Sequence, residues 1–176
     1  GTAISCKGAS DGTLRAMASG GTGDAYQYVW SSGASLQTIT GLSAGDYSVT
    51  VTDINGCEGG AVKTLREPDS VGVHITVMSN YNGQPLTCAD ASDARLRGSA
   101  HGGTPSFDYM WSTGHVTSEL TDVPAGHYTL TAIDANGCQG TAEATIINPD
   151  PVRAEIAGMS DYHGFGVSCN GAADGF

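Results

Sequence analysis

Basic residues are scarce in this chain. Its 176 residues include seven lysines and arginines against 18 aspartates and glutamates, which gives a formal net charge of −11. Nucleic acids and anionic membranes attract basic surfaces, so this balance argues against either one as a partner. We expect no nucleic acid to bind this segment.

Long apolar runs and helical periodicity are lacking too. No run approaches the roughly 18 apolar residues that a membrane span needs, and no signal peptide is recognisable, so we expect any anchor or export signal to lie outside these residues. Charged residues make up only 14 % of the chain, and glycine, serine and threonine are abundant. Short runs with a period of two, such as residues 26–30, 47–52 and 73–78, alternate with glycine-rich turns and predict strands. The composition is typical of an extracellular all-β protein.

A repeat with a period of about 81 residues organises the chain. The tryptophans and two of the cysteines are 81 residues apart, and a second series of cysteines is spaced by 82 and 81 residues. A repeat of this length is a whole domain, because solenoid repeats run about 20 to 50 residues. The matched positions are Trp30 with Trp111, Tyr47 with Tyr128, Asp53 with Asp134, Cys57 with Cys138, and Cys6 with Cys88 and Cys169.

These repeats predict three units: residues 1–69, lacking an opening strand; residues 70–150, complete; and residues 151–176, a truncated third unit. We expect each complete unit to be an antiparallel immunoglobulin-like β-sandwich, with Trp30 and Trp111 in the core rather than on a carbohydrate-binding surface. Pro68 and Pro149 stiffen the short links between units, which predicts an extended rod.

The five cysteines predict two disulfides within units, Cys6 with Cys57 and Cys88 with Cys138, and leave Cys169 to a partner outside the chain. A metal site would require clustered cysteines and histidines, which the units do not share. Four strands are expected between Cys6 and Cys57. If successive strands alternate in direction, an even number of them returns the chain to the end of the sandwich where it started, so both cysteines would lie at that end. An end-to-end rod then requires three strands between Cys57 and Cys88, with residues 80–83 reversing the chain before a strand at residues 86–87.

Recurrent carboxylates stand near these cysteines. Asp11 and Asp93 follow the first cysteine of each unit by five residues, and Asp53 and Asp134 precede the second by four. If the disulfides brought these loops together, the carboxylates would supply part of the oxygen shell that calcium prefers. The interpretation we favour is that each aspartate shapes its own turn, with calcium as the open alternative.

No catalytic constellation is recognisable, since no Gly-x-Ser-x-Gly nucleophile motif surrounds Ser31 or Ser112. We expect no enzyme activity and no cofactor other than the calcium considered above. Asp69, Ser70 and Val71 resemble an Asp-Ser/Thr-apolar acceptor for O-linked glycans, which makes Ser70 a candidate glycosylation site.

Six ordered motifs give the chain a family signature. The first unit reads Cys-x-Gly-x-x-Asp-Gly from Cys6, then Gly-Gly-Thr, Tyr-x-Trp-Ser, Leu-x-Ala-Gly-x-Tyr, Asp-x-Asn-Gly-Cys ending at Cys57, and Glu-Pro. This resembles the SprB repeat of long surface adhesins in gliding Bacteroidota and, more distantly, PKD-type sandwich domains. The second unit departs from the signature with Asp90 and Ala94 in place of the first motif's glycines.

The resemblance implies export by the type IX secretion route, display on the cell surface, and a part in attachment or gliding motility. The expected partners are neighbouring repeats of the same protein, with surface polysaccharide or other copies of the chain as further candidates. Two alternatives stay open: a polymeric extracellular filament joined by strand addition, and spacer domains of a secreted enzyme.

Overall fold

The computed structural model describes residues 4–23 and 25–156, and these residues form two all-β sandwiches. The change from one sandwich to the other lies between Leu65 and Gly72. The strands are β1 (Gly12–Arg15), β2 (Tyr26–Trp30), β3 (Thr38–Leu42), β4 (Gly45–Asp53), β5 (Glu58–Leu65), β6 (Gly72–Val77), β7 (Ala94–His101), β8 (Phe107–Trp111), β9 (Glu119–Val123), β10 (Gly126–Asp134) and β11 (Gln139–Ile146).

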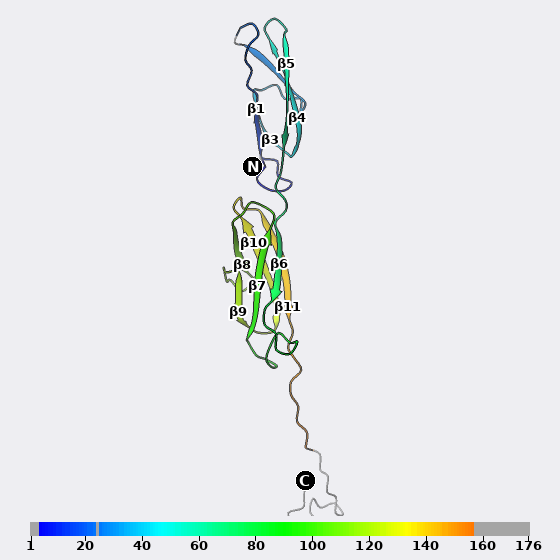
Figure 1. Ribbon diagram of the computed structural model, residues 1–176, viewed down its shortest axis with the longest axis vertical. Coiled ribbons are helices and arrows are strands. Elements are labelled where there is room, and N and C mark those ends of the chain that lie inside the picture. Colours follow the sequence, from blue (N-terminus) through cyan, green and yellow to red (C-terminus); the bar gives the residue numbers. More distant parts are fainter. Residues whose placement is uncertain (1–3, 24, 157–176) are drawn as a thin grey trace, which may run out of the picture.

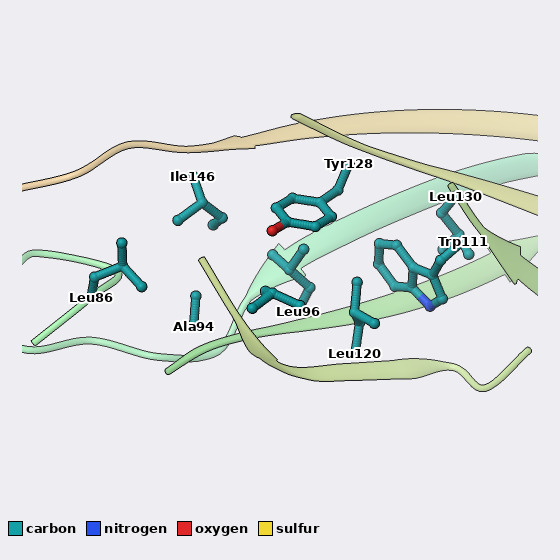
Figure 2. Close-up of a cluster of buried hydrophobic side chains, with 9 residues drawn as sticks. Leu86, Ala94, Leu96, Trp111, Leu120, Tyr128, Leu130 and Ile146 are labelled. Carbon is teal, nitrogen blue, oxygen red and sulfur yellow. The ribbon is translucent and has the colours of Figure 1, made fainter. Parts of the chain in front are cut away.

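The second sandwich packs the sheet β6-β7-β9 against the sheet β8-β10-β11. Alternate residues of these strands point inward and form a core around Trp111 and Leu130, which are 1 % and 0 % exposed (Figure 2). Tyr128 donates its hydroxyl hydrogen to the Pro124 carbonyl at 2.8 Å, as in the tyrosine corner of immunoglobulin-like folds, and burial raises the pKa of this hydroxyl. The immunoglobulin-like sandwich predicted from the sequence is confirmed.

The first sandwich repeats this plan with fewer paired strands. β1 pairs with β3, and β2, β4 and β5 form the facing sheet around the buried Trp30. Among the described residues, no strand of the first sandwich takes the place that β6 has in the second. Accordingly, β1 has four residues, whereas β7, which pairs with β6, has eight.

Successive strands of the first sandwich do not all alternate in direction as predicted. Leu42 lies opposite Gly12, and β4 begins at Gly45, so β1 starts, β3 ends and β4 starts at one end of the sandwich. β2 is antiparallel to β4 and therefore runs in the same direction as β3. Residues 31–37 carry the chain back between these two strands. Four strands thus lead from Cys6 to the opposite end of the sandwich, and the predicted return to the starting end is wrong.

Between Cys57 and Cys88 the structure has two strands, β5 and β6, instead of the predicted three. The expected turn is present as a bridge between Tyr81 and Gln84, but residues 86–87 form no strand. The two sandwiches nevertheless follow one another along the long axis of the molecule (Figure 1). In the described part of the chain, no helix is long and apolar enough to cross a membrane.

Candidate functional site at the junction of the two sandwiches

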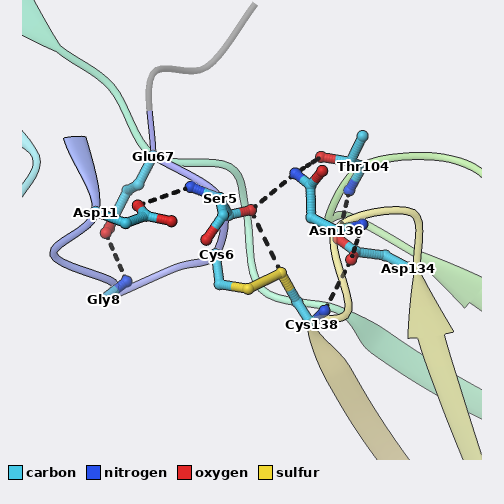
Figure 3. Close-up of a disulfide and its surroundings, with 9 residues drawn as sticks. All are labelled: Ser5, Cys6, Gly8, Asp11, Glu67, Thr104, Asp134, Asn136 and Cys138. Carbon is cyan, nitrogen blue, oxygen red and sulfur yellow. Dashed lines mark hydrogen bonds between the residues drawn. A yellow bond between two sulfur atoms is a disulfide. The ribbon is translucent and has the colours of Figure 1, made fainter. Parts of the chain in front are cut away.

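A disulfide joins the two sandwiches. Cys6, in the loop before β1, bonds Cys138, in the turn between β10 and β11, with 5.7 Å between their Cα atoms (Figure 3). The predicted pairs, Cys6 with Cys57 and Cys88 with Cys138, are therefore wrong. Cys57 and Cys88 are exposed free thiols, and Cys169 lies outside the described residues.

Strand length explains why the bond does not form within a unit. Cys57 stands just before the start of β5, and the Cys6 loop lies near the end of the same strand, where Gly8 contacts Glu67. The eight residues of β5 span about 26 Å at 3.3 Å per residue. A disulfide allows at most about 7 Å between Cα atoms, so only a neighbouring unit can bring a hairpin cysteine to Cys6.

The hairpin that carries Cys138 is held by one buried carboxylate. Asp134 Oδ1 accepts hydrogen bonds from the backbone amides of Asn136 and Cys138, both at 2.9 Å, and Oδ2 accepts one from Thr104 at 2.7 Å. These donors, that of Thr104 foremost, hold the pKa of Asp134 below its usual value. Asp53 makes the same bonds to Asn55, Cys57 and Thr22 and has a lowered pKa for the same reason.

The Cys6 loop is shaped by Asp11 and meets the hairpin through Ser5. Asp11 Oδ1 accepts a hydrogen bond from the Ser5 amide at 3.1 Å, and hydrogen bonding by Ser5 lowers the Asp11 pKa. The Ser5 carbonyl accepts a hydrogen bond from Asn136 Nδ2 at 3.0 Å and lies 3.3 Å from Cys138 Sγ (Figure 3). Asn136 also donates to Thr104 Oγ1 at 2.9 Å. The Asn136 side chain therefore ties the hairpin both to the Cys6 loop of the first sandwich and to Thr104 of the second.

The linker is fastened at both ends. Glu67 accepts hydrogen bonds from the Gly8 amide at 2.7 Å and from Lys7 Nζ at 3.1 Å, and the Gly8 bond is the main cause of its lowered pKa. Two residues later the Asp69 carbonyl accepts a bond from the Gly103 amide at 2.9 Å, and Pro68 between them is buried. The link is short and bonded to both sandwiches, so the junction has little freedom beyond what the disulfide allows.

The carboxylates do not come together as the calcium prediction required. Asp11 and Asp53 lie at opposite ends of the first sandwich, because Asp53 ends β4 and Asp11 precedes β1. Asp93 likewise bonds Thr87 at the far end from Asp134. No group of three or more acidic, histidine or cysteine side chains suited to a metal ion occurs in residues 4–23 and 25–156. The turn-forming role that we favoured for these aspartates accounts for their observed hydrogen bonds.

Sequence reasoning missed the junction residues Ser5, Asn136 and Glu67. Asn136 was visible only as part of the Asp-x-Asn-Gly-Cys turn, and Glu67 only as part of the Glu-Pro link. The spacing of the cysteines does not decide the pairing, since a constant repeat fits Cys6 with Cys138 as well as Cys6 with Cys57. Ser70, the candidate glycosylation site, is an exposed residue of the linker, and its modification stays a prediction.

A comparison with family models matches residues 2–35 to the SprB repeat. A comparison with curated proteins finds no match. The matched stretch contains the Cys6 loop, the first glycine pair and Trp30, which are three of the motifs that predicted the resemblance. Residues 2–35 thus carry a SprB repeat, as the sequence motifs predicted.

Proposed function

We propose that the chain is a load-bearing stalk segment of a secreted cell-surface adhesin, serving attachment or gliding motility. The SprB repeat at residues 2–35 supports a surface-adhesin context. The observation that carries the mechanical role is the Cys6–Cys138 disulfide, which joins consecutive sandwiches and closes a loop with a sequence separation of 132 residues. In this proposal the segment supplies length and strength, and it needs neither a catalytic centre nor a cofactor.

The path of force follows from the disulfide. Tension entering ahead of Cys6 crosses the sulfur bridge to Cys138 and continues into β11. The first sandwich after Cys6 and the second sandwich before Cys138 lie inside the closed loop, where tension at the chain ends cannot extend them. The residues ahead of Cys6 and those after Cys138, which include β11, remain outside the loop.

Single-molecule pulling tests this role. An unbridged chain should lengthen further than the oxidised chain by about 460 Å, because 132 residues at about 3.5 Å each are no longer held in the loop. Cys138→Ser should show the longer extension, whereas Cys57→Ser, which changes the matching free cysteine, should behave like the unmodified chain. Equal extension of the oxidised chain and Cys138→Ser would refute the load-bearing role.

Surface display has its own test. Antibodies raised against the chain should label intact cells, and external protease should abolish the label without lysis. Labelling that appears only after permeabilisation would contradict the proposed location.

A further inference from the structure

The hairpins that carry Cys57 and Cys138 contain the same reactive dipeptide. Asn55-Gly56 lies in the turn between β4 and β5, and Asn136-Gly137 lies in the turn between β10 and β11. An asparagine followed by glycine is prone to deamidation, because the glycine nitrogen carries no neighbouring Cβ that would hinder its attack on the asparagine side chain. Both asparagines are exposed, so water reaches each of them. Sequence and exposure therefore predict equal reactivity.

The turn bonds of the two hairpins are equivalent as well. The Gly56 amide donates to the Asp53 carbonyl at 3.1 Å. The Gly137 amide donates to the Asp134 carbonyl at 3.0 Å. Each bond occupies the nitrogen that would act as the nucleophile, and the effect is the same in both turns. A difference in reactivity must therefore come from the asparagine side chains.

The side chains differ in their contacts with the other sandwich. Asn136 Nδ2 donates to the Ser5 carbonyl at 3.0 Å and to Thr104 Oγ1 at 2.9 Å (Figure 3). This nitrogen is the group that would leave as ammonia, and the side chain must give up both bonds to turn toward the Gly137 nitrogen. Within residues 4–23 and 25–156, Asn55 makes no hydrogen bond to the second sandwich.

The disulfide holds the contact of Asn136 with Ser5 in place. Ser5 directly precedes Cys6, and its carbonyl oxygen lies 3.3 Å from Cys138 Sγ. The bond between the two sulfurs therefore keeps the acceptor of the first sandwich against the hairpin of the second. The contacts that restrain Asn136 last only while the two sandwiches stay joined.

We propose that Asn136 is a deamidation site controlled by the junction. The joined sandwiches protect its side chain, and their separation allows Gly137 to convert Asn136 to aspartate or isoaspartate. The modified residue cannot restore the bond to Ser5, so the reaction is a chemical record that the junction has been open. This inference goes beyond the proposed stalk, since it depends on the junction and not on what the array carries.

The reaction consumes water and releases ammonia. The Gly137 nitrogen gives its proton to solvent and attacks Asn136 Cγ, which forms a carbon–nitrogen bond and closes a succinimide ring. The bond from Cγ to Nδ2 breaks, and the nitrogen takes up a proton and leaves as ammonia. Water then opens the ring at one of its two carbonyls, which gives aspartate or isoaspartate. No oxidant or reductant takes part.

The product has an acceptor where Asn136 has a donor. A carboxylate oxygen in place of Nδ2 has no hydrogen to give to the Ser5 carbonyl, which is itself an acceptor. The lost hydrogen bond and the repulsion between the two oxygens both oppose closure of the junction. Isoaspartate also inserts a methylene into the main chain of the hairpin. A junction that reacts while open therefore does not return to its original state.

The test compares the chain with its junction closed and open. One sample is alkylated while oxidised, and a second is reduced first, so that Cys6 and Cys138 receive groups too bulky for the closed junction. Both samples are kept in mildly alkaline buffer, and deamidation of each Asn-Gly peptide is followed by mass spectrometry. In the closed sample Asn136 should react about tenfold more slowly than Asn55, because its two hydrogen bonds must break first.

Opening the junction should raise the Asn136 rate to that of Asn55. Equal rates in the closed sample, or an Asn136 rate that does not respond to opening, would overturn the proposal. Asn82, which precedes Gly83 in an exposed loop after β6, is the internal control and should react equally in both samples. A parallel rise at Asn82 would assign the protection to the fold of the second sandwich and would overturn the role of the junction.

Thr104→Val separates the two hydrogen bonds of Asn136. It removes the hydroxyl acceptor within the second sandwich and leaves the Ser5 carbonyl in place. Asn136 should stay slower than Asn55 in this variant while the junction is closed. A rate equal to that of Asn55 would show that Thr104 alone protects Asn136 and that the junction takes no part.

Asn136→Asp reproduces one product of the reaction. Dithiothreitol should reduce Cys6–Cys138 faster in Asn136→Asp than in Asn136→Ala, because alanine only loses the bond to Ser5 whereas aspartate adds repulsion. Asn55→Asp, in the hairpin away from this junction, is the matched control and should leave the rate unchanged. Equal rates in Asn136→Asp and Asn136→Ala would contradict the block on closure.

Discussion

At the scale of single residues, two buried aspartates shape equivalent hairpins. Asp53 and Asp134 are 7 % and 5 % exposed, and each carboxylate accepts three backbone hydrogen bonds. Hydrogen bonding to the charged form lowers the folded-state pKa below the unfolded value near 3.9. Their stabilisation is therefore fully present above the unfolded pKa and is lost as the pH falls through the folded pKa.

The lowered pKa of Asp134 gives a test with Asp134→Asn. The unmodified chain should keep a constant free energy of unfolding from neutral pH to about pH 5 and lose stability below about pH 4. The asparagine variant should be less stable at neutral pH, because the side-chain NH2 group that replaces Oδ2 cannot accept the hydrogen bond from the Thr104 amide. It should also show a smaller acid loss in urea titrations. Asp108→Asn, at an exposed position on β8, is the control; an equal change in both variants would contradict the assignment.

The two equivalent hairpins also provide a test variant and a matched control for the junction. Asn136 Nδ2 bonds the Ser5 carbonyl and Thr104, so Asn136→Ala should loosen the contact by about 1 kcal/mol and speed reduction of Cys6–Cys138 by dithiothreitol severalfold. Asn55→Ala changes the equivalent residue of the first hairpin, which faces away from this junction, and should leave the rate unchanged. Equal rates for the two variants would mean that Asn136 does not protect the disulfide.

These residues also show where sequence reasoning succeeded. The turn-forming role of the aspartates was predictable because Asp-x-Asn-Gly is a local signal, in which an aspartate bonds its own turn. The partner of Cys6 was not predictable in the same way. It lies 132 residues away, across a linker, and the repeat spacing fits a partner in either unit.

At the scale of elements, most strands were visible as alternating runs. Residues 26–30 coincide with β2, the predicted strand at residues 47–52 lies within β4, and that at residues 73–78 overlaps β6. The connection at residues 31–37 was not visible. Trp30 and Ala34 form a turn there, with the Trp30 amide bonding the Ala34 carbonyl at 2.9 Å, but the chain then moves to the other sheet without reversing the strand direction. Counting strands could not detect this.

The approach of β6 to β11 gives a prediction at this scale. Gly140→Ala should destabilise the second sandwich by about 1 to 3 kcal/mol, because the new Cβ meets the Val71 carbonyl and the backbones must move apart. Gly59→Ala, at the equivalent position on β5, meets nothing and should be neutral or slightly stabilising in the monomer. Thermal unfolding of both variants decides the matter, and equal destabilisation would contradict the close approach of the Val71 carbonyl to Gly140.

At the scale of the whole molecule, the disulfide changes what an array of such domains can do under tension. A bond within each domain would protect that domain alone, whereas a bond between domains fixes their order and spacing. The linker contacts at Glu67 and Asp69 reinforce the same geometry but are not covalent. The covalent bond is therefore the feature on which the proposed stalk depends.

Disulfide mapping of the native chain tests this account most directly. Free thiols are blocked in the folded protein, and unreduced peptides are identified by mass spectrometry. The account predicts one linked peptide pair, containing Cys6 and Cys138, with Cys57 and Cys88 carrying the blocking group. Peptides linking Cys6 to Cys57, or Cys88 to Cys138, would contradict it.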